Sequence, residues 1–426
     1  MRILMLTQFY PPTIGGEEHQ VRNLSHELAA RGHEVAVATF WNDGLPEFEL
    51  ERTVRIYRIR STVQRADWLF SERARRHAPP FPDPEAVWAL QRVIRQEQPE
   101  IVHAHNWLLH SFLPLKAWSR AKLVVTLHDY SFACAKKRLM YQGAPCSGPN
   151  LGKCLACAGH HYGLGKGVAT VFGHQTMGAL ERATVDMFLP VSHAVAEGNG
   201  LVDSRLPYQV IPNFLPDEPG LHQENMDIYL AQLPPEEFLL FVGDLGHEKG
   251  LFVLLRAYAE LSNAPPLVLI GRAYGDTPAA FPPNVFVYKS WPHAAVLQAW
   301  RHSMAALAPS IWPEPFGLVV IEAMMSSRPV IASKTGGVTD LVVDGETGLL
   351  VPPGDPTALR QAIERLLADP GLRRCMGQAA RRKVTEFQAS AVVPRVEQIY
   401  TDLLNDRGRL YGQGNGLRGI NRESLL

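Results

Sequence analysis

Two glutamates separated by seven residues carry the clearest chemical signal in this sequence. Glu314 lies between two prolines in Pro313-Glu-Pro-Phe-Gly317, and Glu322 follows on an apolar run. A residue before proline favours extended backbone, so Glu314 is expected on a loop, with a helix beginning near Gly317. Glu322 then lies about 7.5 Å along that helix, at about 1.5 Å per residue. One carboxylate is therefore expected before the helix and the other on its second turn.

The first turn of this expected helix is a candidate anion site. Its backbone N–H groups have no partner within the helix, and the helix dipole favours negative charge there. A diphosphate at this end would let Glu322 reach ribose hydroxyls and Glu314 reach a group on the other side, such as a sugar. The alternative is two solvated acids that the helix dipole alone explains. The substrate-binding prediction covers four consecutive residues: Phe316, Gly317, Leu318 and Val319.

Lys249 and a glycine pair add to this interpretation. Lys249 follows the first predicted strand of the second half of the chain, where its ammonium group can neutralise a phosphate at the strand ends. A surface lysine is the alternative. Gly336 and Gly337 follow another predicted strand and would permit close backbone approach to a ligand.

In the first half of the chain, histidines lie at the ends of two predicted strands. His103 and His105 alternate at the end of a predicted strand, so their side chains are expected on one face. His128 ends the next strand and opens an insertion. We assign His105 a functional role and place His128 in the substrate site. The alternative is that each is a hydrogen-bonded structural histidine.

Alternating strands and helices must position these residues. Strands are predicted in the first half at 3–6, 33–40, 54–59, 100–104, 123–127, 187–191 and 209–211, and in the second at 238–243, 267–270, 285–288, 305–308, 330–332 and 348–351. Helices are predicted at 17–31, 250–262, 293–301, 317–327 and 355–367. This pattern predicts an α/β protein with two parallel sheets, each covered by helices on both faces. Ligands should bind outside the carboxyl ends of the strands, in the cleft between the halves.

The length of 426 residues corresponds to two or three domains at about 150 residues each. We expect an N-terminal domain at 1–214 with a Cys-rich insertion at 129–162, a linker at 216–235 and a C-terminal domain at 236–390. A helix at 391–407 would pack back on the first domain. The Gly- and Arg-rich stretch 408–426 is expected to be disordered.

The overall charge excludes some classes of partner. The chain has 42 Lys and Arg and 42 Asp and Glu, which argues against nucleic acid held by a broad positive field. No apolar run reaches the ~18 residues of a membrane span, and the apolar start is too short for a signal peptide. A cytoplasmic protein is therefore expected.

One arginine-rich segment is a candidate for binding a membrane. Eight arginines lie between residues 52 and 76, interrupted by Trp68, Leu69 and Phe70. This segment could contact a phosphorylated acceptor or anionic lipid, and the latter would give a cytoplasmic protein that is peripheral at the membrane. A solvated loop with internal ion pairs is the alternative.

Four of the five cysteines fall within the insertion: Cys134, Cys146, Cys154 and Cys157. The last two form a Cys-x2-Cys pair, a spacing suited to tetrahedral zinc. The segment has little apolar content, so a structural zinc ion could fix a loop without its own core. Free thiols and disulfides are the alternatives, and His160 or His161 could replace a cysteine as ligand.

Several motifs together resemble glycosyltransferase family 4, whose members have the two-Rossmann-domain GT-B fold. The motifs are Gly15-Gly16, Arg31-Gly-His-Glu-Val35, Val191-Ser192, Ile211-Pro-Asn213, Lys249-Gly250, Glu314-x7-Glu322 and Gly336-Gly337. The resemblance covers roughly residues 1–390. It implies retaining transfer from a nucleoside-diphosphate sugar without a catalytic metal or other cofactor.

The resemblance also implies roles for single residues. Glu322 would hold the ribose, Glu314 the donor sugar, and Lys249 the departing diphosphate. Gly15 and Gly16 would approach the phosphates from the first domain, which would also bind the acceptor. A sugar-contacting histidine is expected near His105.

One position departs from the family pattern. Asp244 stands where an arginine usually pairs with the diphosphate, and a carboxylate there repels phosphate. Asp244 could point away, Arg272 or His247 could compensate for its charge, or the donor could carry less charge. Trp291 is expected near the base. An epimerase or phosphorylase on the same fold, or a non-catalytic nucleotide-sugar-binding protein, are the alternatives to a transferase. The base, the sugar and the acceptor are not given by these motifs.

Overall fold

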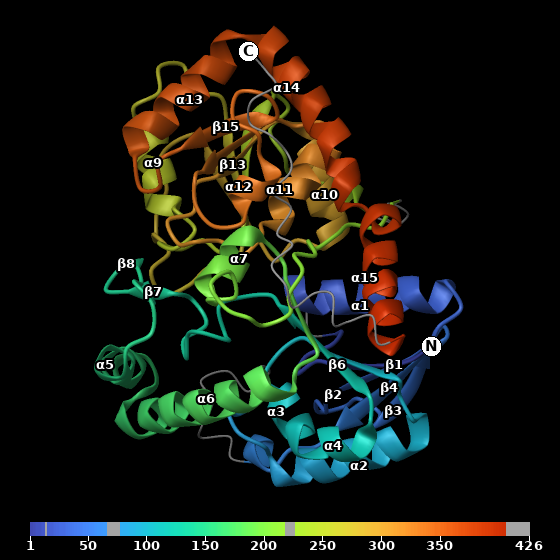
Figure 1. The fold of residues 1–426 in the computed structure, drawn as a ribbon. Helices are drawn as coiled ribbons and strands as arrows, with labels where there is room; N and C mark the ends of the chain where they lie inside the picture. The colour runs from blue at the N-terminus through green and yellow to red at the C-terminus, as the bar shows by residue number, and fades with distance from the viewer. Residues whose placement is uncertain (13–14, 66–76, 218–225, 406–426) are drawn as a thin grey trace.

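The structure is a computed structural model that describes residues 1–12, 15–65, 77–217 and 226–405 (Figure 1). Two parallel α/β sheets, each covered by helices, make up this part of the chain. The predicted fold class is confirmed. The predicted tail at 408–426 lies outside the described residues.

The first sheet has seven strands in the order β3-β4-β2-β1-β5-β6-β9. All neighbours are parallel except β3, which runs antiparallel to β4 at one edge. The central strands are apolar and buried on both faces, as expected for a parallel sheet between helix layers. The strands are β1 Arg2–Leu6, β2 Glu34–Phe40, β3 Phe48–Glu51, β4 Val54–Ile59, β5 Ile101–Ala104, β6 Lys122–Leu127 and β9 Met187–Pro190.

Helices cover both faces of this sheet (Figure 1). Asp83 caps α2 by accepting a hydrogen bond from the backbone N–H of Ala86. Glu17 and Glu18 lie in the first turn of α1, where the helix dipole favours acids. The helices are α1 Gly16–Ala30, α2 Pro84–Glu97, α3 Leu109–Phe112, α4 Lys116–Ser119 and α7 His193–Gly198, with 3-10 turns at Val63–Arg65 and Leu113–Leu115.

The second sheet has six parallel strands in the order β12-β11-β10-β13-β14-β15. Its strands are β10 Phe238–Val242, β11 Leu267–Gly271, β12 Val285–Lys289, β13 Ser303–Ala308, β14 Val330–Ser333 and β15 Gly348–Val351. Its helices are α8 Asp227–Leu230, α9 Leu251–Ala259, α10 His293–His302, α11 Leu318–Met325, α12 Val338–Leu341, α13 Pro356–Ala368 and α14 Pro370–Lys383. Asp355 caps α13 and Pro356 occupies its first position, as the sequence predicts.

The last described helix, α15 Ala389–Leu404, follows the 3-10 turn Val384–Phe387 and lies beside α1 (Figure 1). Its apolar face is buried against the first sheet through Val393, Val396 and Tyr400. An imidazole–carboxylate contact of 2.8 Å between His33 and Glu397 adds a polar link. The chain therefore leaves the second sheet and ends its described part on the first.

The insertion differs from the predicted loop without a core. It contains a two-stranded hairpin, β7 Met140–Tyr141 and β8 Ala144–Pro145, and the helix α5 Leu151–Tyr162, and the helix α6 Leu164–Thr184 follows it directly. Ala135, Ala158 and Val171 form a small buried cluster between these elements. The insertion therefore packs around a small apolar core of its own.

The predicted four-cysteine zinc site is not formed. Within the part of the chain that the structure describes, no three His, Cys, Asp or Glu side chains gather as ligands for a metal ion. Cys134 is partly buried against the core, and Cys154 packs in the small cluster beside the insertion. Cys146 and Cys157 donate instead to the carbonyl oxygens of Gly148 and Met140. All four are free thiols.

Two other predictions need correction. The strand predicted at 209–211 is only a bridge between Phe188 and Tyr208, although Gln209 N donates to Phe188 O at 3.0 Å. Proline at position 207 and Pro212 leave few N–H groups for a longer ladder. The predicted linker also contains the short helix α8.

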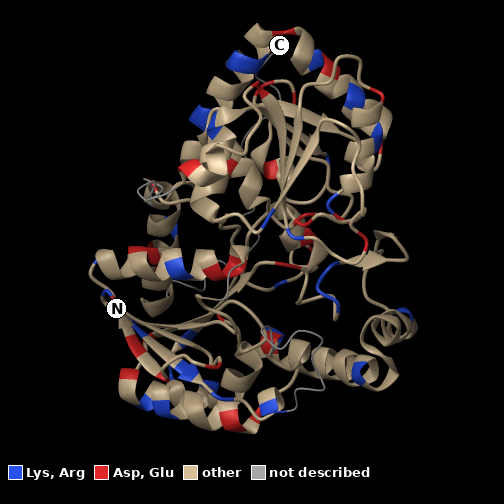
Figure 2. Ribbon diagram, turned by 180° about the vertical axis from the view of Figure 1, so that it is seen from behind, with Lys and Arg blue, Asp and Glu red and all other residues tan. Residues whose placement is uncertain are grey.

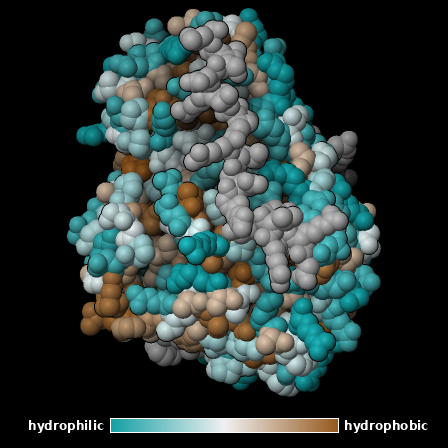
Figure 3. Space-filling model, in the orientation of Figure 1, coloured by the Kyte–Doolittle hydropathy of each residue, from teal (hydrophilic) through white to brown (hydrophobic). Residues whose placement is uncertain are grey.

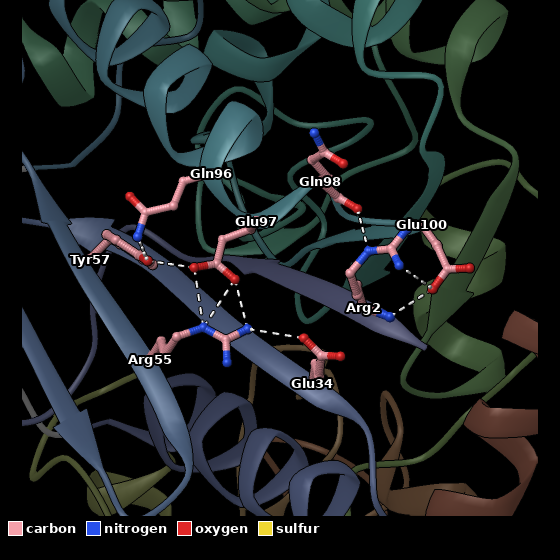
Figure 4. Close-up of polar contacts among 8 residues, drawn as sticks. All are labelled: Arg2, Glu34, Arg55, Tyr57, Gln96, Glu97, Gln98 and Glu100. Atoms are coloured by element: carbon pink, nitrogen blue, oxygen red, sulfur yellow. Dashed lines mark hydrogen bonds and ion pairs between the residues drawn. The ribbon is translucent and has the colours of Figure 1, made fainter.

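The described arginines of the 52–76 segment pair with glutamates. Arg55 donates to both carboxylate oxygens of Glu97, and Oε1 of Glu97 also accepts from the Tyr57 hydroxyl (Figure 4). The nearly buried Arg58 lies 2.6 Å from Glu49. These contacts favour the ion-pair alternative for this stretch; Trp68, Leu69, Phe70 and the arginines after residue 65 lie outside the described residues. None of the helices that the structure describes is long and apolar enough to span a bilayer.

Candidate active site

The loop that carries Glu314 joins β13 to α11 and is held by the backbone of a glycine pair. Gly337 N donates to Glu314 O at 2.7 Å. A Cβ atom on Gly336 would lie 2.2 Å from Glu314 O, and one on Gly337 would lie 2.2 Å from Pro315 O. The close approach predicted for a ligand is thus made by this loop. Gly336 and Gly337 position Glu314.

The Glu314 carboxylate is held from several directions. Its Oε2 lies 2.6 Å from Lys249 Nζ and accepts hydrogen bonds from Trp312 Nε1 at 3.1 Å and Ser310 Oγ at 3.3 Å. Lys249 belongs to a loop that is fixed to the same segment, because Ile311 N donates to Glu248 O at 2.9 Å. The structure therefore brings Lys249 and Glu314, which are far apart in sequence, into one half-buried ion pair.

Glu322 lies on α11, which begins after Gly317 in the left-handed conformation that glycine favours. Its carboxylate is buried, lies 2.8 Å from His293 Nε2 and accepts from Trp300 Nε1 at 3.4 Å. Burial alone would lower the pKa of His293, but the hydrogen bond and negative charge of Glu322 outweigh it, and the pKa is raised. The N-terminus of α11, whose first N–H groups have no partner within the helix, thus lies between two acids. Glu314 is paired with the cationic Lys249, and Glu322 with the ionisable His293.

The N-terminus of α1 meets this site from the first sheet. A Cβ atom on Gly16 would lie 3.0 Å from Leu318 Cδ1, so the glycine brings the two helix starts close together. Gly15 precedes it as the extended N-cap of α1. One turn later, the His19 ring stacks on His293 with centroids 5.6 Å apart. Burial, then the His293 charge, lowers the pKa of His19.

Asp244, the position that departs from the family pattern, has a cationic partner. Arg272 Nε lies 3.1 Å from its carboxylate, and the Tyr274 hydroxyl donates to it at 3.2 Å. Both members of the ion pair are exposed. Of the two candidates for compensation, Arg272 therefore contacts Asp244. His247 N instead donates to Asp276 at 2.8 Å.

Trp291 borders a cavity of about 720 Å³ at the carboxyl ends of β11 and β12. Its ring stacks on Tyr288 at 4.7 Å, and Tyr229 of α8 packs edge-on at 5.4 Å. The Tyr288 hydroxyl donates to Gln232 O, which ties the segment after α8 to the same wall. Tyr274 lines the cavity too, so it adjoins the Asp244–Arg272 pair.

The histidines of the first sheet form a stacked row. The rings of His103 and His105 lie 4.3 Å apart, and His105 Nδ1 lies 3.0 Å from His128 Nε2. Burial lowers the pKa of His105 well below its ordinary value, and the pKa of His128 to about 4, so both are neutral near pH 7. His105 Nε2 is buried without a hydrogen-bond partner among the described residues. The three rings border a cavity of about 30 Å³, room for about one water molecule.

His103 itself is fixed by structural contacts. Its Nδ1 lies 2.6 Å from the Tyr400 hydroxyl of α15 and its Nε2 lies 2.7 Å from Thr126 Oγ1. Burial lowers its pKa to about 3. His103 thus matches the structural alternative, whereas His105 keeps one open nitrogen.

Some residues of the site were not singled out from the sequence. Glu17 accepts from Asn106 Nδ2 at 2.6 Å, and burial, then the Glu18 charge, raises its pKa to about 8. Its place directly after Gly15-Gly16 was the available signal. The Tyr130 hydroxyl donates to Pro313 O at 3.0 Å, and Ser192 Oγ donates to Pro315 O at 2.6 Å. These bonds join the Glu314 loop to the first domain.

The predicted residues fall into two groups. Gly15, Gly16, Lys249, Glu314, Glu322 and residues 316–319 lie around the start of α11, and Arg272 and Trp291 lie at the neighbouring strand ends. His105 and His128 lie together at the carboxyl ends of β5 and β6. Among the described contacts, no hydrogen bond joins the two groups.

Comparisons with known proteins agree with this geometry. Residues 14–215 match the family model described as Glycosyltransferase Family 4, and residues 229–383 match the one described as Glycosyl transferases group 1. Together these matches cover both sheets.

Similar proteins extend over almost the whole chain. Glycogen synthase of Mycobacterium tuberculosis is 27% identical, over 94% of each chain. N-acetyl-alpha-D-glucosaminyl L-malate synthase of Bacillus anthracis is 26% identical, over 93% of this chain and 96% of its own. Sucrose-phosphate synthase of Thermosynechococcus elongatus has a similar fold, with a TM-score of 0.72 and 22% identity over 95% of this chain and 99% of that one. Anabaena HepE in complex with UDP-glucose has a TM-score of 0.64 and 17% identity over 95% and 99%.

Proposed function

Since the chain belongs to glycosyltransferase family 4 and transfers a sugar from a nucleotide sugar, we propose that the donor binds around the start of α11 and reacts with retention at the anomeric carbon. The observation that carries this proposal is the placement of two paired acids, Glu314 and Glu322, on either side of a helix N-terminus. We propose that the second domain, 236–390, binds the donor and the first, 1–214, the acceptor.

We assign the diphosphate to the N–H groups of residues 317–319. Lys249 would supply positive charge from one side and Arg272 from the other. Glu322 is assigned to the ribose and Glu314 to the transferred sugar. The cavity beside Trp291 is assigned to the base, because it adjoins the same strand ends and is lined by aromatic rings. Solved relatives of the same fold bind UDP-glucose (HepE) and ADP (starch synthase IV of Arabidopsis thaliana).

Catalysis in this proposal is mainly charge stabilisation of the leaving group. When the anomeric carbon–oxygen bond breaks, negative charge develops on the diphosphate next to Lys249 and the helix start. The leaving phosphate itself would accept the proton of the acceptor hydroxyl on the same face. We assign the open Nε2 of His105 to a polar contact with the sugar. His128 would hold the His105 ring in place. No step needs a catalytic metal or another cofactor.

We propose that the acceptor group is a hydroxyl of a glycan, a lipid or a small metabolite. Relatives of similar coverage make such different products as glycogen and an N-acetylglucosaminyl malate. Glu17 and Asn106 lie where the first domain meets the site, and we propose that they border the acceptor position. A cytoplasmic location and the lack of a nucleic-acid partner stay predictions.

A thermal-shift screen with UDP-, ADP- and GDP-glucose tests the donor assignment. A donor at 100 times its Kd should add about 2.7 kcal/mol of stability. Glu322→Ala should weaken nucleotide binding, whereas Glu314→Ala should keep most of the binding and lose turnover. Trp88→Ala, an exposed residue on α2 away from the site, is the matched control. Negligible effects of both glutamate substitutions would overturn the assignment.

A further inference from the structure

The loop that carries Glu314 is held by its carbonyl groups. In Pro313-Glu314-Pro315 the two prolines have no backbone N–H to donate. Each of the three successive carbonyl oxygens accepts one hydrogen bond: Pro313 O from the Tyr130 hydroxyl at 3.0 Å, Glu314 O from Gly337 N at 2.7 Å, and Pro315 O from Ser192 Oγ at 2.6 Å. The backbone on both sides of the Glu314 side chain is therefore bonded at every carbonyl.

Two of these three donors belong to the first domain. Tyr130 and Ser192 follow β6 and β9, neighbouring parallel strands whose carboxyl ends lie at one edge of the first sheet. The described partners of the Glu314 carboxylate all belong to the second domain: Lys249, Ser310 and Trp312. Figure 2 shows charged residues of both signs where the two domains meet. Among the described hydrogen bonds, the first domain therefore reaches Glu314 through the backbone beside it and not through its carboxylate.

One short helix, α7, positions both hydroxyl groups where the domains meet (Figure 1). Ser192 is its N-cap, and the Ser192 hydroxyl accepts from Val195 N at 3.1 Å while it donates to Pro315 O. At the other end of α7, a Cβ atom on Gly198 would lie 2.5 Å from the ring of Tyr130. The glycine thus leaves room for the Tyr130 ring, and α7 fixes how far apart the two hydroxyl groups lie.

The two hydroxyl bonds are buried and directional. Both Tyr130 and Ser192 are buried. Burial, then the Glu314 charge, raises the pKa of Tyr130, so its hydroxyl keeps the proton that it donates. On the face in Figure 3, hydrophobic as well as hydrophilic residues show between the two domains. Because apolar contact has no preferred direction and a hydrogen bond has one, the hydroxyl bonds can fix the loop more narrowly than this mixed surface.

We propose that Tyr130 and Ser192 are positioning residues that hold the Glu314 carboxylate in reach of the transferred sugar, through the carbonyl groups of its two neighbours. The inference rests on the proposed role of Glu314 and deepens it, because it gives the first domain a part in the donor chemistry. It also gives a function to the Val191-Ser192 motif. A reacting group displaced by 1 Å costs about 100-fold in rate. Loss of either bond should therefore lower turnover and leave nucleotide binding in place.

Tyr130→Phe and Ser192→Gly test the proposal, because the first removes only a hydroxyl and glycine is nearly as good an N-cap as serine. Each should lower kcat for release of UDP or ADP from its glucose ester, with water as acceptor, by about fivefold or more, as for one lost hydrogen bond. The Kd for the free nucleoside diphosphate should stay within about twofold. Tyr258→Phe is the matched control: the buried Tyr258 hydroxyl donates to Pro265 O at 2.7 Å within the second domain. It should lose similar stability in urea and keep kcat.

Amide hydrogen exchange of the full chain without donor gives a second readout. Peptides covering 310–318 and 336–341 should exchange about fivefold faster in Tyr130→Phe and Ser192→Gly, and as in the parent in Tyr258→Phe. Unchanged exchange there, or a fall in nucleotide affinity equal to the fall in kcat, would overturn the positioning role. A parent that neither binds nor turns over a nucleotide sugar would instead refute the donor assignment, while exchange still decides whether the two hydroxyl groups hold the loop.

Discussion

Gly336→Ala should disable the site without touching any residue that contacts the donor. Gly336 has a φ of +60°, and its Cβ would lie 2.2 Å from Glu314 O and 2.5 Å from Glu314 N. Ordinary contacts of a Cβ atom begin at 3.4 Å, so the two segments must separate by more than about 1 Å. Because the clash is with backbone, no side-chain rotation relieves it. The Glu314 loop must move, and a 1 Å displacement of a reacting group costs about 100-fold in rate.

Gly345→Ala provides the control, since Gly345 has a φ of +79° but its Cβ would meet nothing within 4 Å. It should lose about 1–2 kcal/mol from the left-handed conformation alone. Gly336→Ala should lose about 1–3 kcal/mol more through overpacking. Urea unfolding measures both values, and release of nucleoside diphosphate from the donor, per folded molecule, measures turnover. If Gly336→Ala turned over donor within threefold of Gly345→Ala, the positioning role of Gly336 would be refuted.

Three further substitutions have expected outcomes in titration or binding. The pKa of His293 is raised in the folded protein, so its protonated form adds stability below about pH 6.5, and this is lost as the pH rises through the folded pKa. His293→Gln should therefore lose stability in urea near pH 6 and little near pH 9; an equal loss would contradict this. The pKa of Glu17 is about 8, above its unfolded value, so the folded state weakens as the pH rises from about 4.5 to 8. Glu17→Gln should flatten that slope and be more stable than the parent near pH 9, and an unchanged slope would rule out a buried, protonated Glu17. Arg272→Ala should change stability by less than about 1 kcal/mol, because the pair is exposed. In calorimetry it should bind UDP or ADP about tenfold more weakly, since Asp244 then faces the diphosphate alone; unchanged affinity would exclude compensation by Arg272.

Local patterns predicted the sheets well and the insertion poorly. The strands β4 and β15 match the predicted ranges 54–59 and 348–351, because their apolar residues are bounded by turn residues. The edge strand β3 is short and half-exposed, so its pattern is weak. In α6, glycine replaces large residues where the helix packs, which hides the periodicity that predicts a helix.

The spacing of Glu314 and Glu322 is a local property and could be read from the sequence. Helix geometry fixes how far Glu322 lies from the start of α11. Their partners are tertiary: His293 comes from α10 and Lys249 from the loop after β10. The same limit applies to Gly336. The sequence shows that its backbone can be approached closely, but only the tertiary structure shows that the Glu314 loop makes this approach.

Three acids of the proposed donor site each have a cationic or ionisable partner: Glu314 with Lys249, Glu322 with His293, and Asp244 with Arg272. In the proposed donor site, a diphosphate would therefore have to displace the acids from their cationic partners. Under the proposed assignment, Lys249 would turn to the phosphate and free Glu314 for the sugar. Removal of Lys249 alone would leave the Glu314 charge facing the diphosphate without compensation.

A double-mutant cycle tests this exchange. Lys249→Met should weaken nucleoside-diphosphate binding by about 100-fold, from a lost charged hydrogen bond and new repulsion. Adding Glu314→Gln should recover about tenfold of that affinity, because it removes the repulsion, although turnover stays low without the carboxylate. Calorimetry with the diphosphate that the thermal-shift screen selects gives the coupling between the two sites. Additive losses would mean that Glu314 does not face the phosphates when Lys249 is absent, and the exchange would be wrong.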